Sequence, residues 1–557
     1  MSHTKSSPDE LIFYHHNLRE DVFVEGWRHD VPDKSRTLSY QLHGDPGARR
    51  LRWPLQREQC KTAASSARGS PSGLSHPDDC DCSMANTYHL TDRETAAMKI
   101  ALLVHQFLPH HAAGTEQLTL KIAHELCRRG HDARIITGEP LRNAGLPAIE
   151  SSTFAGITVF RFVGLGPCNS FSHIQNRRAE RLLSKLLTVW RPDIIHAHHF
   201  IHVGVGCAAV ANKAQIPVVY TPTDFWWCCP ATRFQEADGR PCPGPGTFAG
   251  RCARHMSALW AERRRVAIRS WMPRVPWQLF AGVVLITSIP GVSLIPMASW
   301  FSKLGARERT LARLRDSLSF VFAPTVEVYN ALLRAGFPAT KMELLPYGIE
   351  RPVPSAVRPR QHPQITIGFI GTLQSHKGAH LLLEALKMLP SHPCLRVEIY
   401  GDPSVDTIYA ERLRSLAYGS AHDIVFCGTF PEAEIGDTFA QLDALVIPSL
   451  WTENRPLVLL SALMARVPVI VSDQPGLICE VINNKNGLVV PNGDAGALAQ
   501  ALVRISTDRE LRRAIARHPK RPKELRTYVD NLYERYTELV KTAPMVRCES
   551  NSPLPRP

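Results

Sequence analysis

The sequence predicts an α/β protein with two Rossmann-like domains. Two series of apolar strands that alternate with amphipathic helices carry this prediction, one beginning at Lys99 and the other at Ile365. Alternation of this kind favours parallel sheets covered by helices on both faces. The length of 557 residues also fits two domains of ordinary size with additional segments.

The first series predicts strands in KIALLVH, HDARIIT, ITVFRF, DIIHA and IPVVYT, with helices over Thr115–Arg129, over Ser172–Trp190 and after His202. The second predicts strands in ITIGFIG, LRVEIYG, DIVFCG, ALVIPS and VPVIVS. Between the two series lie SFVFAP, a helix and LLPYGI, and a last helix is expected from Glu524 to Lys541.

Changes in composition and in the pattern of apolar residues along the chain predict seven segments. They are an N-terminal extension at 1–97, a first Rossmann-like domain at 98–255, a basic and apolar insert at 256–318, the end of that domain with a hinge at 319–363, a second Rossmann-like domain at 364–506, C-terminal helices at 507–541 and a tail at 542–557. Residues 1–97 are rich in Ser, Pro, Asp, Arg and His without a period, which predicts disorder or a start codon placed too early, with Met84 or Met98 as the true start.

The composition is that of a globular protein, with 44% hydrophobic and 21% charged residues. The formal net charge of +14 favours anionic partners such as nucleotide sugars, acidic lipid surfaces or nucleic acid. No zinc-finger, RNA-recognition or homeodomain pattern occurs, so we expect no nucleic acid partner. The 14 scattered cysteines and the lack of a secretory pattern predict a cytoplasmic protein with reduced thiols.

The most informative loop follows the strand ALVIPS and carries the acid Glu453, after which Pro456 begins an apolar helix. Ligands of parallel sheets collect at the carboxyl ends of the strands, where helix N-termini supply free N–H groups. Glu453, Asn454 and Arg455 are therefore expected to face a ligand. The alternative is a solvated loop acid beside an ordinary buried helix.

Two further loops have the same place relative to a strand. Gly114 and Thr115 begin a helix after the first strand and offer backbone N–H groups to a phosphate, although a single Gly there is also an ordinary turn residue. Gly371 and Thr372 open the loop GTLQSHKG, in which Lys377 supplies a point charge for a pyrophosphate or is a surface lysine.

Together these motifs resemble the retaining glycosyltransferases of family 4 (glycosyl transferases group 1), over roughly Met98 to Lys541. The resemblance implies the GT-B architecture, with two Rossmann-like domains facing a central cleft and the final helix crossing back to the first. It implies transfer of a sugar from a nucleoside diphosphate sugar to an acceptor hydroxyl with retention, without a required cofactor or metal. Glu453 would orient the sugar hydroxyls and Lys377 would neutralise the diphosphate. The donor-binding set it implies is Gly114, Thr115, Gly371, Thr372, Asn454, Arg455, Pro456, Leu457 and Ser461.

The acceptor side resembles the family segment H-D-F-W-x-x-C-P, present here as TDFWWCCP. Asp224 matches the motif Asp and is expected to be catalytic, while Thr223 stands in place of the His. His198 and His199 follow the strand DIIHA and are candidates to face the same cleft, or are packing histidines.

Four departures from the family pattern favour a second hypothesis. Thr223, Thr372, Ser461 and Arg466 stand where relatives have His, Arg, Glu and Gly. The alternative function is therefore a catalytically weakened or non-catalytic GT-B binding or scaffold protein. A nucleotide-sugar epimerase on a similar fold is a third, less favoured because the TDFWWCCP segment and the insert indicate a transferase.

A structural zinc site is predicted from the spacing C-x12-C-x9-C-x2-H of Cys229, Cys242, Cys252 and His255. The alternatives are free cysteines or a disulfide, and the adjacent Cys228 leaves the ligand count open.

The insert contains an uncharged run from Val275 to Ser302 that follows the basic stretch ERRRVAIRSWMPR. Pro276, Pro290 and Pro296 interrupt it, so docking on an anionic bilayer fits better than a membrane crossing. An internal hairpin is the alternative. Docking would imply a lipid-linked or growing glycan acceptor at the inner face of the membrane, in bacterial-type cell-surface glycan or glycolipid synthesis.

Overall fold

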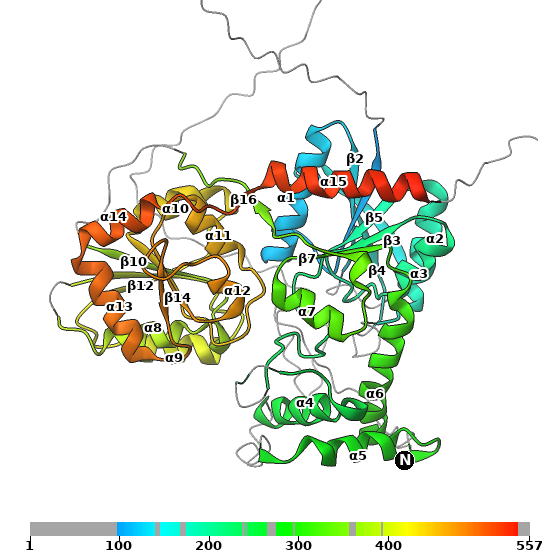
Figure 1. Cartoon of the computed structure of the whole chain (residues 1–557), viewed down its shortest axis with the longest axis horizontal. Helices are drawn as coiled ribbons and strands as arrows, with labels where there is room; N and C mark the ends of the chain where they lie inside the picture. Colours follow the sequence, from blue (N-terminus) through cyan, green and yellow to red (C-terminus); the bar gives the residue numbers. More distant parts are fainter. Residues whose placement is uncertain are drawn as a thin grey trace, which may run out of the picture. The chain divides into compact units, whose positions relative to one another are not determined.

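The computed structural model describes residues 97–139, 145–166, 174–236, 240, 242–263, 274–292, 296–355, 364–391 and 394–543. The prediction of an α/β fold with two Rossmann-like domains is confirmed, because two largely parallel sheets are each covered by helices (Figure 1). The predicted N-terminal extension, apart from Ala97, and the tail beyond Ala543 lie outside the described residues.

The first sheet has eight strands in the order β3-β4-β2-β1-β5-β6-β7-β8, and only β3 runs antiparallel to its neighbour. The strands are β1 (Lys99–Val104), β2 (Asp132–Gly138), β3 (Ala148–Phe154), β4 (Ile157–Val163), β5 (Ile194–Ala197), β6 (Val218–Tyr220), β7 (Phe320–Ala323) and β8 (Met342–Leu344). The connecting helices are α1 (Gly114–Arg128), α2 (Arg177–Val189), α3 (Gly206–Lys213) and α7 (Val326–Arg334).

The second sheet has six parallel strands in the order β12-β11-β10-β13-β14-β15. They are β10 (Thr366–Ile370), β11 (Arg396–Tyr400), β12 (Asp423–Gly428), β13 (Ala444–Ile447), β14 (Val469–Ser472) and β15 (Leu488–Val490). Its helices are α8 (Ala379–Leu386), α9 (Thr407–Ala417), α10 (Ile435–Gln441), α11 (Leu457–Met464), α12 (Pro475–Ile478), α13 (Ala495–Thr507) and α14 (Arg509–Arg517).

The last helix, α15 (Leu525–Thr542), packs on the first sheet rather than the second. Its Tyr528 and Tyr536 are fully buried in a core that also contains Leu102 of β1. His196 of β5 bonds the Tyr536 hydroxyl through Nδ1, and Arg129 pairs with Asp530 at 2.6 Å. Just before α15, β16 (Lys523–Glu524) pairs with β9 (Gly348–Ile349). Helix α15 is thus fixed to the first domain.

Two local predictions differ from the structure. The helix expected from Ser172 begins at Arg177, because the Asn176 side chain caps it by accepting bonds from the backbone N–H groups of Arg178 and Ala179. Strand β3 was not predicted, because its sequence AIESSTF is polar and lies largely exposed at the sheet edge.

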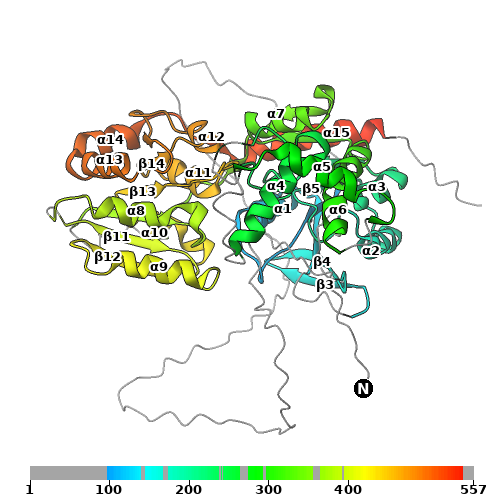
Figure 2. The same cartoon turned by 90° about the horizontal axis from the view of Figure 1, so that it is seen from below.

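The insert contains three helices, namely α4 (Gly250–Arg263), α5 (Trp277–Thr287) and α6 (Pro296–Arg315). In Figure 1, α4 and α5 lie side by side, and α6 runs across them towards the first domain; Figure 2 shows the same helices from below. They share a small core that includes Met256, Val284 and Trp300. None of the described helices combines the length and apolar composition that a membrane crossing needs.

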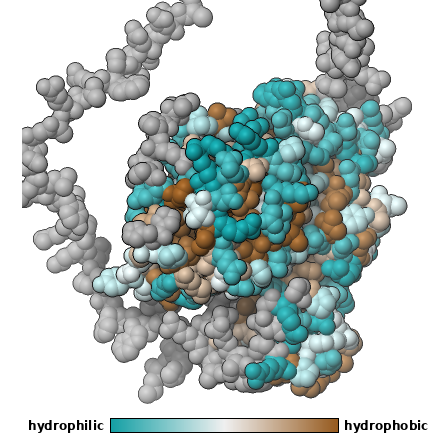
Figure 3. All heavy atoms as spheres, turned by 60° about the vertical axis from the view of Figure 1, so that its left-hand side comes forward, coloured by the Kyte–Doolittle hydropathy of each residue, from teal (hydrophilic) through white to brown (hydrophobic). Residues whose placement is uncertain are grey.

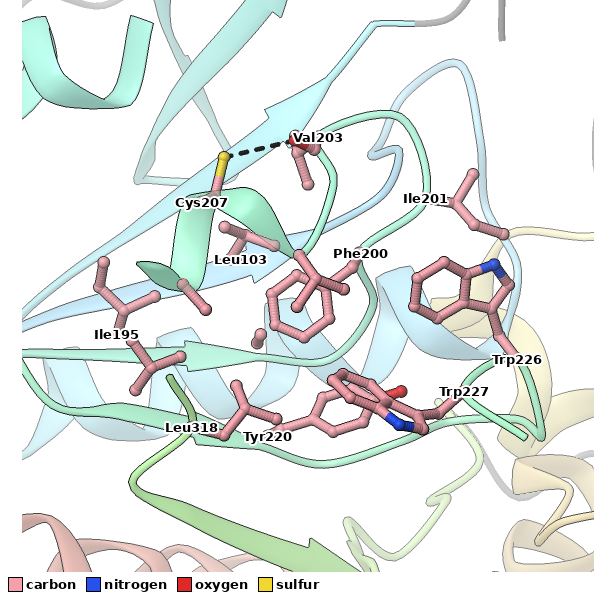
Figure 4. Close-up of a cluster of buried hydrophobic side chains, with 14 of the residues drawn as sticks. Leu103, Ile195, Phe200, Ile201, Val203, Cys207, Tyr220, Trp226, Trp227 and Leu318 are labelled. Carbon is pink, nitrogen blue, oxygen red and sulfur yellow. Dashed lines mark hydrogen bonds between the residues drawn. The ribbon is translucent and has the colours of Figure 1, made fainter. Parts of the chain in front are cut away.

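Aromatic packing fixes the loop after β6. Figure 4 shows Phe200, Tyr220, Trp226 and Trp227 gathered in the core of the first domain. The ring centroid of Tyr220 lies 5.2 Å from that of Phe200 and 5.6 Å from that of Trp227. The two tryptophans directly follow the Asp224-Phe225 pair, so burying them holds the predicted acceptor loop in place.

Arg466 adopts a left-handed backbone conformation with φ 64° at the turn between α11 and β14. The resemblance predicted that Arg466 would crowd this turn where relatives have Gly. Its side chain is exposed, so the strain lies in the backbone.

We expect Arg466→Gly to raise the free energy of unfolding by about 0.5–1 kcal/mol, because Gly adopts this φ without steric cost but is more flexible when unfolded. Chemical denaturation measures the difference. The matched control is Arg412→Gly inside α9, where Gly should instead cost about 1 kcal/mol. Destabilisation by both substitutions would contradict backbone strain at Arg466.

Candidate active site

Glu453 lies buried in the loop after β13, where its carboxylate forms an ion pair with Lys377. Lys377 Nζ donates to Oε1 at 2.8 Å, and the Ser449 hydroxyl donates to the same oxygen at 2.7 Å. Among the described residues, no donor is bonded to Oε2. The two residues predicted to be catalytic on the donor side are therefore in direct contact.

Lys377 ends the short 3-10 turn Ser375–Lys377 after β10, the neighbour of β13 in the sheet. The two loops are joined by the backbone bond from Leu450 N to His376 O at 2.8 Å. Gly378 has φ +77°, and a Cβ there would lie 1.9 Å from the carbonyl oxygen of Pro448. Only Gly allows so close an approach, which brings Lys377 to Glu453.

Asn454 and Arg455, predicted as donor-binding residues, are committed to protein partners. Asn454 accepts a hydrogen bond from Thr325 Oγ1 at 3.2 Å and donates to the carbonyl of Pro222 at 3.2 Å. Arg455 forms a buried ion pair with Glu480 at 2.8 Å. The Arg455 charge is therefore neutralised inside the protein and does not replace the Arg missing at Thr372.

The remaining donor-side residues surround the start of α11. Pro456 precedes this helix at the N-cap position, and Leu457 is its first residue. A Cβ on Gly114 would lie 3.6 Å from Leu457 Cδ1, so the first turn of α1, which contains Gly114 and Thr115, reaches this helix end. Ser461 is buried one turn further along α11.

Gly371 and Thr372 follow β10 directly. Gly371 donates its backbone N–H to Tyr400 O at 3.1 Å, and the Thr372 carbonyl accepts from Gln374 N at 2.9 Å. Both residues are partly buried, so Thr372 offers a hydroxyl, but no positive charge, at this end of the sheet.

On the acceptor side, Asp224 pairs with His199. Asp224 Oδ2 lies 3.1 Å from His199 Nε2, and Oδ1 accepts the backbone N–H of Trp226 at 2.7 Å. Thr223 donates its hydroxyl to the carbonyl of His198 at 3.3 Å. The structure thus brings Asp224 and His199 together, while Thr223 bonds the backbone.

His198 and His196 have structural partners. His198 Nδ1 lies 2.9 Å from the Thr119 hydroxyl, and burial lowers the pKa of His198 to about 3, so its ring is neutral. His196 lies between Tyr536 and Thr221 and, like His198, is fully buried. Both side chains are therefore hydrogen-bonded to neighbouring groups within the first domain.

Sequence reasoning missed a buried contact between the side chains of His105 and Glu116. His105 Nε2 lies 3.5 Å from Glu116 Oε1, and the His105 ring centroid is 4.5 Å from that of His199. Burial raises the pKa of Glu116 from 4.5 to about 7. The sequence signal that could have found this contact is the position of the two residues. His105 directly follows β1, and Glu116 lies in the first turn of α1.

The two sides of the site meet through the loops after β6 and β13. The Pro222 carbonyl bonded by Asn454 directly precedes Thr223 and Asp224, and Asn454 directly follows Glu453. Groups from both sheets therefore border one site.

The four predicted zinc ligands line one small cavity. Cys229, Cys242, Cys252 and His255 surround it together with Cys228. In the part of the chain that the structure describes, no group of three or more His, Cys, Asp or Glu side chains is arranged to hold a metal ion. The convergence of the four residues agrees with the prediction, but their arrangement is not that of a metal site.

Two family models match the chain and together cover more than half of it. Residues 112–269 match Glycosyltransferase Family 4, and residues 354–521 match Glycosyl transferases group 1.

Curated relatives are about 30% identical to the chain. The D-inositol 3-phosphate glycosyltransferase of Corynebacterium urealyticum is 31% identical over 226 residues, which are 39% of this chain and 52% of that protein. The amylovoran biosynthesis glycosyltransferase AmsK of Erwinia amylovora is 30% identical over 187 residues, 32% of this chain and 45% of the relative. The chain thus spans about half the length of these relatives.

Solved structures share the fold at low sequence identity. Anabaena HepE in complex with UDP-glucose has a TM-score of 0.52 and 16% identity, covering 79% of this chain and 100% of HepE. The sucrose-phosphate synthase of Thermosynechococcus elongatus has a TM-score of 0.54 and 14% identity, covering 80% of this chain and 99% of the synthase. The architecture is therefore that of the GT-B proteins, two Rossmann-like domains with ligand-facing loops at their strand ends. The chain belongs to the family 4 glycosyltransferases (glycosyl transferases group 1).

The raised pKa of Glu116 makes stability depend on pH. The folded-state pKa of about 7 lies above the ordinary 4.5, so the ionised carboxylate is the disfavoured form. Burial therefore costs nothing below about pH 4.5, and stability is lost as the pH rises towards 7.

Glu116→Gln removes this titration. We expect the unfolding free energy of the variant, relative to wild type, to increase by up to about 3 kcal/mol between acidic and neutral pH. Denaturation at a series of pH values measures it, with the exposed Glu411→Gln as the control. If the unfolding free energies of wild type and Glu116→Gln changed equally with pH, the titration of a buried Glu116 would be contradicted.

Proposed function

We propose that this protein transfers a sugar from a nucleoside diphosphate sugar to an acceptor hydroxyl with retention of configuration. The observation that carries the proposal is the Lys377–Glu453 ion pair at the carboxyl ends of β10 and β13. In parallel sheets this edge binds ligands, and the pair supplies one cation and one carboxylate there.

Lys377 is proposed to stabilise the leaving diphosphate. One N–H of its ammonium is bonded to Glu453, and its side chain is 22% exposed. Two further N–H groups thus remain for phosphate oxygens, and the N–H groups at the start of α11 can assist. Charge that develops on the leaving group would be met by donors already in position, which lowers the barrier to bond cleavage.

Glu453 is proposed to orient the donor sugar. Both of its described hydrogen bonds end on Oε1, which leaves Oε2 to accept bonds from sugar hydroxyls. Since the carboxylate is buried and held from two sides, it loses little conformational entropy when a sugar binds.

Asp224 is proposed to receive the acceptor hydroxyl with His199 beside it. The Asp224 carboxylate is held by the Trp226 backbone N–H, so its position is fixed before the acceptor arrives. Domain closure would exclude water, which otherwise competes with the acceptor. We expect transfer without an added divalent cation.

We place the reaction in bacterial-type cell-surface glycan or glycolipid synthesis, in the cytoplasm at the inner face of the membrane. Two observations support this placement. The relative AmsK is a glycosyltransferase of amylovoran biosynthesis, and the described cysteines are free thiols. The acceptor is then a lipid-linked or growing glycan.

A second candidate is a GT-B protein that binds a nucleotide sugar without transferring it. The commitment of Arg455 to Glu480 favours it, because the Arg455 charge is then not available to replace the Arg missing at Thr372. Ser461 is also too short to make the contact of the Glu found in relatives. One lost hydrogen bond to a charged group costs about 1.5–3 kcal/mol.

Donor binding tests the proposal. We expect UDP-glucose or another nucleoside diphosphate sugar from a UDP, GDP and ADP panel to raise the thermal midpoint of the protein. Lys377→Ala should weaken donor affinity at least tenfold, while Lys387→Ala, an exposed lysine after α8, leaves it unchanged. A folded wild type that gains no stability from any donor would contradict nucleotide-sugar binding.

Transfer is then measured with the donor that binds. Release of nucleoside diphosphate should depend on the acceptor. If NMR shows that the sugar in the product has the same anomeric configuration as in the donor, the retaining transferase is supported. Tight binding without transfer would establish the second candidate instead.

A structural zinc ion in the Cys229, Cys242, Cys252 and His255 cavity stays a proposal, supported by the shared cavity. Burial raises the pKa of Cys242 to about 11, so zinc binding would release protons. We expect one zinc per purified chain by elemental analysis, lost in Cys252→Ser but kept in Cys394→Ser. A folded, zinc-exposed protein without bound zinc would exclude the ion.

A further inference from the structure

Helix α5 is apolar around most of its circumference, and Gln278 is the exposed polar residue in it. Its sequence WQLFAGVVLIT contains no charged residue. Ala281, Val284 and Thr287 are buried, and Val284 belongs to the core shared with α4 and α6. A helix on the surface of a globular protein ordinarily presents polar residues on the side away from its core.

The outer side of α5 instead exposes large hydrophobic side chains. Leu279 is 63% exposed and Ile286 is 57% exposed. The two residues lie on the same helical face at positions i and i+7, with Val283 between them. Leu285 and Ile289 extend the same surface, and Ile289 is 51% exposed. We call these five residues, Leu279, Val283, Leu285, Ile286 and Ile289, the α5 face.

Exposed hydrophobic residues elsewhere do not gather in this way. Figure 3 shows the ordinary mixture of hydrophilic and hydrophobic side chains on one side of the molecule. The other described helices expose at most two large hydrophobic side chains each, such as Val326 and Leu333 of α7, or a single one, such as Ile408 of α9. Five within eleven residues mark an interaction site rather than chance exposure.

The charge of the sequence on either side of α5 indicates the kind of partner. From Gly250 to Lys303 the sequence contains eight Lys or Arg residues and one acid, Glu262. Arg274 is exposed just before α5, and the Arg251 guanidinium carbon lies 5.0 Å from the Trp277 ring centroid at the helix start. Tryptophan and arginine are the residues that settle at the headgroup level of a bilayer.

A second copy of the chain fits less well. A two-fold interface places the same patch of both subunits together, so two strongly basic segments would face each other. An anionic lipid surface instead neutralises the basic charge while its acyl region covers the apolar side chains. An eleven-residue helix is about 16 Å long, about half the hydrocarbon core, so α5 would lie along the surface.

We propose that the α5 face docks this protein on an anionic phospholipid surface. This inference goes beyond the proposed transfer reaction, since it depends on the insert and not on the Glu453 loop. It would bring the first domain, which carries Asp224 and His199, to a surface where lipid-borne hydroxyls are concentrated.

Vesicle co-sedimentation of the full chain tests the inference. We expect the wild type to sediment with phosphatidylcholine–phosphatidylglycerol vesicles, at least tenfold more weakly with phosphatidylcholine alone, and less as salt is added. The double variant Leu279→Asp, Ile286→Asp should weaken binding to the mixed vesicles at least tenfold. The matched control is Met388→Asp, Ile408→Asp, two residues of similar exposure in the second domain, which should bind like wild type.

Three outcomes would overturn the proposal. They are no sedimentation of the wild type with anionic vesicles, equal sedimentation of the α5 variant, and equal binding to neutral vesicles. Light scattering adds a check, since a wild-type dimer that the α5 variant converts to monomers, without vesicle binding, would make the α5 face a contact between copies. The thermal shift with nucleotide sugars should be the same in the α5 variant, so failure of docking and failure of donor binding are told apart.

Discussion

The site depends on one electrostatic constraint, the need of the buried Glu453 carboxylate for a cation. Lys377 meets this need from the next strand of the sheet, and Ser449 adds a second hydrogen bond. Removing one partner of a buried ion pair typically costs several kcal/mol, because the other charge stays desolvated. The left-handed Gly378 and the adjacency of β10 and β13 are the structural conditions for this contact. The geometry of the donor side thus follows from the order of two strands.

Much of the fold was predictable because its signals are local. Strands such as β1 and β14 are short apolar runs next to a predicted helix, and each can be recognised from a few consecutive residues. The polar edge strand β3 has no such signal, because an exposed edge does not require buried side chains. The helices of the insert were not resolved individually from the sequence, since a continuous apolar run lacks the periodicity that separates them.

The site was predictable as a set of loops but not as a set of contacts. Glu453 and Lys377 were both expected at strand ends, yet their bond joins residues 76 positions apart. Arg455 and Asn454 have the chemistry to bind a donor, and nothing in the sequence indicates that their side chains are bonded to Glu480 and Thr325. Glu116 looked like an ordinary first-turn acid, because its complete burial arises only from tertiary packing. Local rules place functional groups, and tertiary partners determine which of them remain available.

Asn454 has a consequence that reaches beyond its own hydrogen bonds. It is bonded to Thr325, Pro222 and Tyr347 of the first domain, while its neighbour Glu453 lies in the loop after β13 of the second. Any separation of the two domains at this point must therefore break these bonds or pull the Glu453 loop with it. A ligand of one domain that shifts this contact would change the affinity of the other domain by thermodynamic linkage, and the same factor would apply in both directions. Cooperativity between the two ligands would in this way be built into a single amide side chain.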